Sequence, residues 1–199
     1  MAQHREPGFW TPANIITVGR MFLIPVVMAF LFTDAPWAGW TAMVIFVIAG
    51  ISDLIDGYLA RLYEQVSIVG SFLDPLADKL MVMAVMVMLI PWGRIPPWLV
   101  VVLLARELVI TGLRGIASAE GIIISASAGG KFKTAYQIFG LSFLLIHYRY
   151  LDIDCHRVGL WLLYMSAGIS LWSGWMYCYE FWKISKLRKS GEGSEAEPA

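Results

Sequence analysis

The chain has 199 residues, the size of a single domain, and 58% of them are hydrophobic. With a mean hydropathy of +0.66, this composition goes beyond what a water-soluble core needs and makes the lipid bilayer the expected solvent. Fifteen basic and fifteen acidic residues cancel, so the net charge gives no basis for a nucleic-acid partner. The two cysteines, Cys155 and Cys178, lack the pair spacing of a disulfide framework or a zinc site.

The amino-terminal residues 1–13 are expected to form an interfacial lead-in rather than a signal peptide, because the apolar run behind them is too long. Six predominantly apolar segments follow, and each approaches the roughly 20 residues that a membrane-spanning helix needs. They cover residues 14–34, 37–61, 68–91, 96–116, 132–148 and 158–182. The sequence therefore predicts an all-α integral membrane protein, with six transmembrane helices in one domain over residues 14–182.

Basic residues near the ends of these segments predict the orientation, because lysine and arginine are retained on the cytoplasmic side of a membrane. Most of them fall on the side of a six-span zigzag that carries both termini: Arg5, Arg61, Arg114, Lys131, Lys133, Lys183, Lys186, Arg188 and Lys189. Only Arg94, Arg149 and Arg157 fall on the other side. Both termini are thus expected in the cytoplasm, with a disordered low-complexity tail over residues 183–199.

Four aspartates lie in the second and third predicted helices, where a carboxylate costs about 2.5–3.5 kcal/mol and by default marks function. Asp53 and Asp56 are about 60° apart on one helix face, and Asp74 and Asp78 are about 40° apart on the next. In an antiparallel hairpin that turns near residue 65, Asp53 and Asp78 lie about 19 Å from the turn, and the other two lie about 13 Å from it. All four carboxylates are therefore expected to converge at one depth near the cytoplasmic side.

Such a cluster predicts a divalent metal site, because carboxylates at close quarters cannot all stay ionised without cations. Mg²⁺ or Mn²⁺ suits oxygen ligands, and either ion also neutralises a pyrophosphate. Gly57 and Ala60 share the face of the first aspartate pair, and such small residues permit either the approach of a ligand or close helix packing. Arg61 is expected to bind phosphate, with a headgroup anchor as the alternative.

The spacing of this region resembles, without departure, the signature of the CDP-alcohol phosphatidyltransferase family. The matching segments are Asp53-Leu-Ile-Asp56-Gly57-Tyr-Leu-Ala60-Arg61 and Gly70-Ser-Phe-Leu-Asp74-Pro-Leu-Ala-Asp78. The resemblance implies a six-helix membrane enzyme, usually a homodimer, in which a hydroxyl group displaces CMP from a CDP-linked lipid or alcohol. It further implies that Asp53, Asp56 and Asp74 bind two metal ions, with Asp78 as a further ligand and the general base. Gly70 is expected to border the CDP-lipid together with the small residues and the arginine named above.

The acceptor of the transferred group is predicted from basic residues elsewhere in the chain. Arg106 lies in the middle of the fourth predicted helix, and Glu107 points about 100° away around the axis, so the two are not expected to neutralise each other. With Arg114, Lys131 and Lys133, this arginine forms a basic set that suits an acceptor carrying its own phosphate. Glycerol 3-phosphate fits that description, whereas serine and choline do not.

Three further segments resemble bacterial phosphatidylglycerophosphate synthases, namely Ala105–Arg114, Gly130–Thr134 and Asn14–Arg20. The last of these implies that Asn14 and Thr17 help to hold the cytidine nucleotide. The expected reaction joins CDP-diacylglycerol and glycerol 3-phosphate at the cytoplasmic face of a bacterial inner membrane. Cardiolipin synthase and phosphatidylinositol-phosphate synthase are the rivals within the family, and a divalent-cation transporter is the rival of another class.

Two smaller patterns are expected to be structural. Ser166, Ser170 and Gly174 form a ladder of small residues on the sixth predicted helix, which suits either a dimer seam or an internal packing face. Residues 152–156 hold metal-ligand types in a short connection on the side opposite the aspartates, and no metal is expected there.

Overall fold

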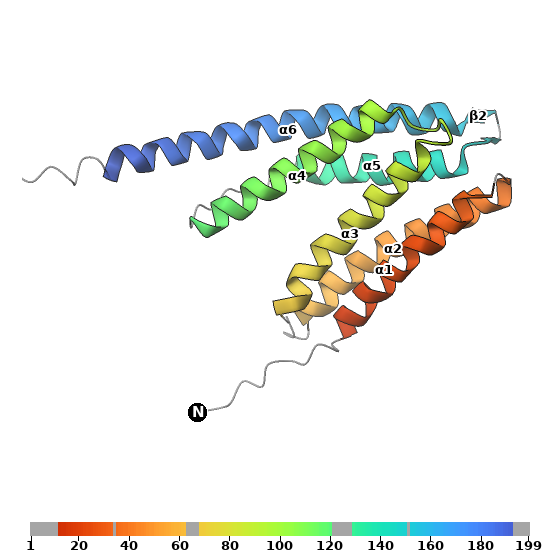
Figure 1. Cartoon of the computed structure of the whole chain (residues 1–199), viewed down its shortest axis with the longest axis horizontal. Coiled ribbons are helices and arrows are strands. Elements are labelled where there is room, and N and C mark those ends of the chain that lie inside the picture. Colours follow the sequence, from red (N-terminus) through yellow and green to blue (C-terminus); the bar gives the residue numbers. More distant parts are fainter. Residues whose placement is uncertain (1–11, 34, 63–67, 121–128, 151, 193–199) are drawn as a thin grey trace, which may run out of the picture. The chain divides into compact units, whose positions relative to one another are not determined.

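The structure is a computed structural model that describes residues 12–33, 35–62, 68–120, 129–150 and 152–192. Within these ranges it describes the helix but not the side chains at residues 12–17, 53–62, 68–78, 129–131 and 187–192. The described part of the chain is almost entirely helical, which confirms the all-α prediction (Figure 1). Its helices are α1 (Pro12–Leu31), α2 (Pro36–Leu62), α3 (Ile68–Leu89), α4 (Pro97–Ala119), α5 (Gly129–Ile146) and α6 (Cys155–Glu192).

The ends of α6 differ from the prediction in two ways. The helix continues through residues 183–192, which were expected to belong to the disordered tail, because lysine, leucine and arginine in this stretch extend a helix already begun. Residues 193–199 of that tail lie outside the described residues. Before α6, the short connection contains a small antiparallel hairpin of β1 (Arg149–Tyr150) and β2 (Ile153–Asp154), which was not predicted.

Over the described ranges, no helix meets the combined criteria of length and apolar character for a membrane span. The chain divides into two compact units, residues 1–97 with 138–161 and residues 98–137 with 162–199. In the first unit, α1 packs against both α2 and α3, and α2 also contacts α3. The start of α1, the end of α2 and the start of α3 lie at the same end of this three-helix group (Figure 1).

The opposite end of the first unit is closed by contacts around the last turn of α5. The Arg94 Nη1 atom donates a hydrogen bond of 3.2 Å to the Leu145 carbonyl oxygen, and Trp40 meets Tyr150 edge to face at 5.5 Å between ring centroids. Gly39 of α2 also approaches this turn so closely that a Cβ atom there would lie 2.6 Å from the same carbonyl oxygen. These contacts fix α2 and α3 at the end remote from the aspartates.

This close approach predicts that Gly39→Ala lowers the free energy of unfolding by about 1–3 kcal/mol, because backbone must move to admit the methyl group. Gly50→Ala in the same helix is the matched control, since a Cβ atom there meets nothing within 4 Å. The control is expected to be neutral or slightly stabilising because alanine favours a helix. Thermal unfolding of the purified variants measures both effects, and equal midpoints for the two variants would contradict the close approach.

Candidate functional site

The backbone places the four aspartates at matched positions on α2 and α3, although their side chains lie outside the described residues. Asp56 lies six residues before the end of α2, and Asp74 lies six residues after the start of α3. Asp53 and Asp78 are nine and ten residues from the same helix ends. The connection, residues 63–67, is centred on residue 65. The helix boundaries therefore agree with a turn near residue 65, and the convergence of the four carboxylates stays a prediction.

The described halves of α2 and α3 show which helix faces are covered. On α2 the buried apolar side chains recur at three- and four-residue intervals, at Ala38, Ala42, Phe46 and Ala49. On the described part of α3 the buried side chains are Met81, Val85, Met86 and Leu89. Continued along α2, this spacing reaches positions 53 and 56. Continued back along α3, it reaches positions 78 and 74. The aspartate positions thus extend the two covered faces.

A third helix belongs to this site, because α1 packs against both aspartate helices. The residues expected to border the CDP-lipid all lie on the helix ends that meet there: Asn14 and Thr17 on α1, Gly57, Ala60 and Arg61 on α2, and Gly70 on α3. Their side chains are outside the description, as are those of the aspartates. The backbone nevertheless brings these positions to one end of the three-helix group (Figure 1).

Sequence reasoning did not select Arg20 of α1 as a site residue. Its side chain is only 3% exposed, which is rare for an arginine. Among the described side chains of α1, residues 18–31, the other buried ones are Val27 and Leu31, at intervals of seven and four residues, so Arg20 lies on the same covered face. The available signal was that Arg20 is the one charged residue within the 20 residues of α1.

In the second unit, Arg106 of α4 is joined to α6. Its Nε atom donates to the Ser170 carbonyl oxygen at 2.9 Å, and its Nη2 atom donates to the Ser173 hydroxyl at 2.8 Å. A Cβ atom on Gly174 would lie 3.4 Å from the Arg106 Nε atom. The ladder of small residues therefore packs internally here, and it provides the space that a guanidinium group needs between two helices.

Glu107 connects this arginine to a buried lysine of α5. The Glu107 Oε2 atom lies 3.4 Å from the Arg106 Nη1 atom and also forms an ion pair with the Lys133 ammonium group. The expectation that Arg106 and Glu107 would not neutralise each other was wrong. Their Cβ atoms point in different directions, but both side chains are long enough to bend toward each other. The three side chains together carry one net positive charge.

The remaining predicted acceptor residues are less constrained by the structure. Arg114 is exposed on α4. The Lys131 side chain lies outside the described residues, although its position in the first turn of α5 is given. Lys133 is held from two sides, since the Ser166 hydroxyl of α6 donates to its carbonyl oxygen at 3.0 Å. Arg106 and Lys133 are thus fixed between helices, whereas Arg114 is open to solvent or ligand.

The cluster at residues 152–156 has structural partners of its own. Asp154 forms an ion pair with Arg157, with 3.1 Å between Oδ2 and Nε. Burial, and then the neighbouring Asp154 carboxylate, raise the pKa of the Cys155 thiol, which keeps it protonated and a poor metal ligand. Across the part of the chain that the structure describes, no three such side chains are grouped to hold a metal ion.

Comparison with known proteins supports the importance of the aspartate region. The family model for CDP-alcohol phosphatidyltransferase matches residues 10–176. A CDP-diacylglycerol–glycerol-3-phosphate 3-phosphatidyltransferase of Bacillus subtilis is 34% identical over 87% of this chain and 96% of its own length. An enzyme of the same name from Cereibacter sphaeroides is 37% identical over 69% of this chain and 64% of its own.

A relative with another printed name is a CMP-forming cardiolipin synthase of rice, which is 33% identical over 92% of this chain and 60% of its own length. Both names fall within one family, and the family match includes every aspartate position of the site and the helix that carries Arg20. Because the family model matches most of the chain and the Bacillus subtilis relative is 34% identical over 87% of it, the chain belongs to the CDP-alcohol phosphatidyltransferase family.

Proposed function

We propose that this chain transfers the phosphatidyl group of CDP-diacylglycerol to the 1-hydroxyl of glycerol 3-phosphate, releasing CMP and phosphatidylglycerophosphate. The observation that carries the proposal is the similarity to the Bacillus subtilis enzyme, because it covers nearly the whole of both chains. The matched register of four aspartates on α2 and α3 supports the same chemistry, since phosphoryl transfer relies on positioning and on charge stabilisation.

The donor set at this site fits two Mg²⁺ or Mn²⁺ ions. All four of its acidic positions are aspartates, and neither nitrogen nor sulfur ligands accompany them on the two helices at this level. Carboxylate oxygens are the ligands that these hard ions prefer. Asp53, Asp56 and Asp74 are the proposed principal ligands, with Asp78 contributing. The ions supply charge neutralisation at the pyrophosphate and at the departing CMP.

The chain's own residues then perform four tasks. Asn14 and Thr17 hold the cytidine nucleotide. Gly57, which has no side chain, and the small Ala60 leave room for the pyrophosphate beside α2. Asp78 accepts the proton of the acceptor hydroxyl while the oxygen of that hydroxyl bonds to the phosphorus that carries diacylglycerol. The bond from that phosphorus to CMP breaks, and CMP leaves with the electron pair while Arg61 offsets its charge.

The basic residues of α4 and α5 are proposed to bind the phosphate of the acceptor. Arg106, Lys133 and Glu107 together carry one net positive charge, which leaves them able to attract an anion. Arg114 is exposed and has a planar guanidinium group that binds phosphate through two hydrogen bonds. Lys131, at the start of α5, is proposed to complete the set.

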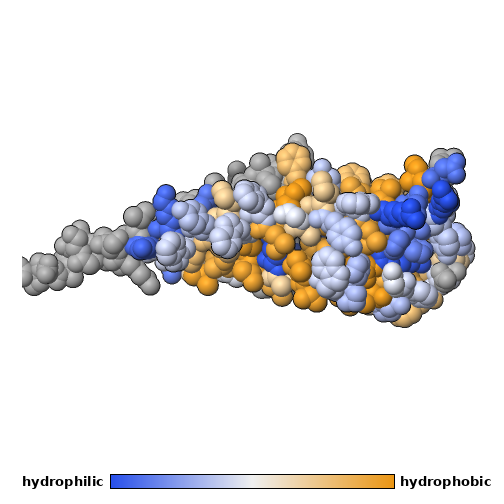
Figure 2. Space-filling model, turned by 90° about the horizontal axis from the view of Figure 1, so that it is seen from above, coloured by the Kyte–Doolittle hydropathy of each residue, from blue (hydrophilic) through white to orange (hydrophobic). Residues whose placement is uncertain are grey.

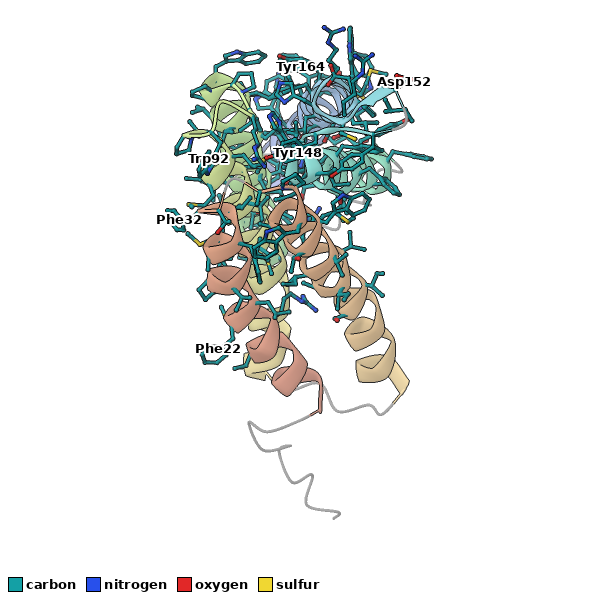
Figure 3. All side chains as sticks on the ribbon, turned by 90° about the vertical axis from the view of Figure 1, so that its right-hand side faces the viewer. Phe22, Phe32, Trp92, Tyr148, Asp152 and Tyr164 are labelled. Atoms are coloured by element: carbon teal, nitrogen blue, oxygen red, sulfur yellow. The ribbon has the colours of Figure 1, made fainter. Side chains whose placement is uncertain are left out.

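A membrane location is also part of this proposal. Large apolar side chains are exposed along the helices, including Phe22, Phe32, Trp161 and Trp172, each at least 69% exposed. Phe22 of α1 and Phe32, directly after its end, project outward (Figure 3). Hydrophobic residues cover much of the surface in view in Figure 2. Such a surface is more stable in lipid than in water. We therefore propose a six-helix homodimer in a bacterial inner membrane, with both termini and the site facing the cytoplasm.

The acceptor can be identified by the release of CMP from CDP-diacylglycerol by purified protein with Mn²⁺ or Mg²⁺. Glycerol 3-phosphate is expected to support turnover, whereas glycerol, serine and inositol phosphate are not. Only glycerol 3-phosphate matches both the basic set and the names of the relatives. Turnover with phosphatidylglycerol alone would instead assign cardiolipin synthesis. No release of CMP by folded protein with any acceptor would overturn the enzymatic proposal, and metal uptake into vesicles would then favour transport.

Replacing the proposed base provides a second test. Asp78→Asn is expected to lower kcat by at least about 100-fold because the amide cannot accept the hydroxyl proton. Binding of a soluble CDP-alcohol in the presence of Mn²⁺ is expected to persist, since three aspartates remain. Isothermal titration calorimetry with the CDP-alcohol measures this binding. If Asp78 were instead an essential metal ligand, Asp78→Asn would lose both binding and turnover.

The exposed arginine of α4 allows the acceptor site to be tested. Arg114→Ala is expected to raise the KM for glycerol 3-phosphate about 10- to 100-fold, because one or two charge-assisted hydrogen bonds are lost. Its thermal stability is expected to change little. Arg157→Ala is the matched control, because Arg157 is also exposed but lies next to the β-hairpin. An unchanged KM in Arg114→Ala would remove this residue from the acceptor site.

A further inference from the structure

Arg20 occupies a covered position on the helix that packs against both aspartate helices. It lies eight residues after the start of α1, while Asp53 lies nine residues before the end of α2 and Asp78 ten residues after the start of α3. Those three helix ends lie at one end of the first unit (Figure 1). At about 1.5 Å per residue, the three positions are therefore at nearly the same height, about 12–15 Å from that end.

The charge pattern of the three helices is equally specific. Arg20 is the single charged residue of α1, and the acidic residues of α2 and α3 are the four signature aspartates. A guanidinium group that is 3% exposed needs compensating acceptors or anions around it, because an uncompensated buried charge is strongly destabilising. The other buried cations are satisfied elsewhere, since Arg94 donates to the Leu145 carbonyl oxygen and Lys133 pairs with Glu107.

We infer that Arg20 is a positioning cation of the aspartate site, and that it helps to bind the pyrophosphate of the CDP-linked substrate. The inference rests on the proposed function and concerns the balance of charge there. Four carboxylates and two divalent ions cancel, but the pyrophosphate diester adds one negative charge on each phosphate. Two further cations restore neutrality in a poorly solvated site. The three helices carry three candidates, Arg61, Lys79 and Arg20, and of the two whose side chains are described, Arg20 is buried whereas Lys79 is half-buried.

This role predicts effects of opposite sign on two ligands. Without Arg20 the site is more negative, so Mn²⁺ alone binds as tightly as before or more tightly. A pyrophosphate diester loses an attractive charge, so it binds more weakly. A residue that merely supported the packing of α1 would give a different result, because a loosened site binds both ligands less well.

The test uses the full-length protein and two titrations, with Mn²⁺ followed by electron paramagnetic resonance and with CDP-glycerol in saturating Mn²⁺ followed by calorimetry. Arg20→Met is expected to keep or improve the affinity for Mn²⁺ and to weaken CDP-glycerol binding at least about tenfold. Arg20→Lys, which keeps the charge, is expected to recover most of that loss. Arg94→Met is the matched control, because it removes a buried arginine of the same unit at the remote end, and its CDP-glycerol affinity should be unchanged.

Unchanged CDP-glycerol binding in folded Arg20→Met overturns the inference. A parallel loss of affinity for both Mn²⁺ and CDP-glycerol also overturns it. If Arg20→Met does not fold, Arg20→Lys decides: it must bind CDP-glycerol within about threefold of the wild type, and a loss of binding to both ligands overturns the inference. Failure of the proposed function is separate, because the wild-type protein would then release no CMP with glycerol 3-phosphate whatever the behaviour of Arg20.

Discussion

Repulsion among four carboxylates on two apolar helices has to be offset by positive charge, since charges in poorly solvated surroundings interact strongly. This constraint accounts for the features of the first unit. The aspartate positions continue the covered faces of α2 and α3, and α1 packs against both helices with a single, buried arginine at the same height. Divalent cations and a substrate that brings its own pyrophosphate complete the balance that we propose for this family member.

A second set of contacts closes the remote end of the first unit. The covered face of α2 consists largely of Ala38, Ala42 and Ala49, so neighbouring helices approach it closely. Gly39 extends that approach to the last turn of α5, where Arg94 binds the same carbonyl oxygen. The second unit has a comparable device, in which Arg106 joins α4 to α6 and Glu107 joins it to α5. In the first unit an arginine in the connection after α3 binds α5, and in the second unit an arginine of α4 binds α6, both through directional hydrogen bonds.

Much of the fold could be predicted from two features of the sequence. The apolar segments predicted the helices, and the short connection between two regular helices predicted the heights of Asp53 and Asp78. Interactions of long side chains could not be predicted. The Arg106 and Glu107 positions diverge by about 100°, yet their ends meet. Arg20 was missed because one arginine in an apolar helix looks like any positive-inside residue until its burial is known.

The proposed chemistry requires aspartates of both α2 and α3 to form one two-metal site, and this requirement can be tested by counting bound Mn²⁺ with electron paramagnetic resonance. The wild-type protein with CDP-glycerol is expected to bind two ions per chain, with the magnetic coupling typical of ions about 3.5–4 Å apart. Asp53→Asn and Asp74→Asn should each remove that coupling, because each helix supplies part of the site. Uncoupled ions in the wild type, or coupling that survives either substitution, would contradict the proposed two-metal site.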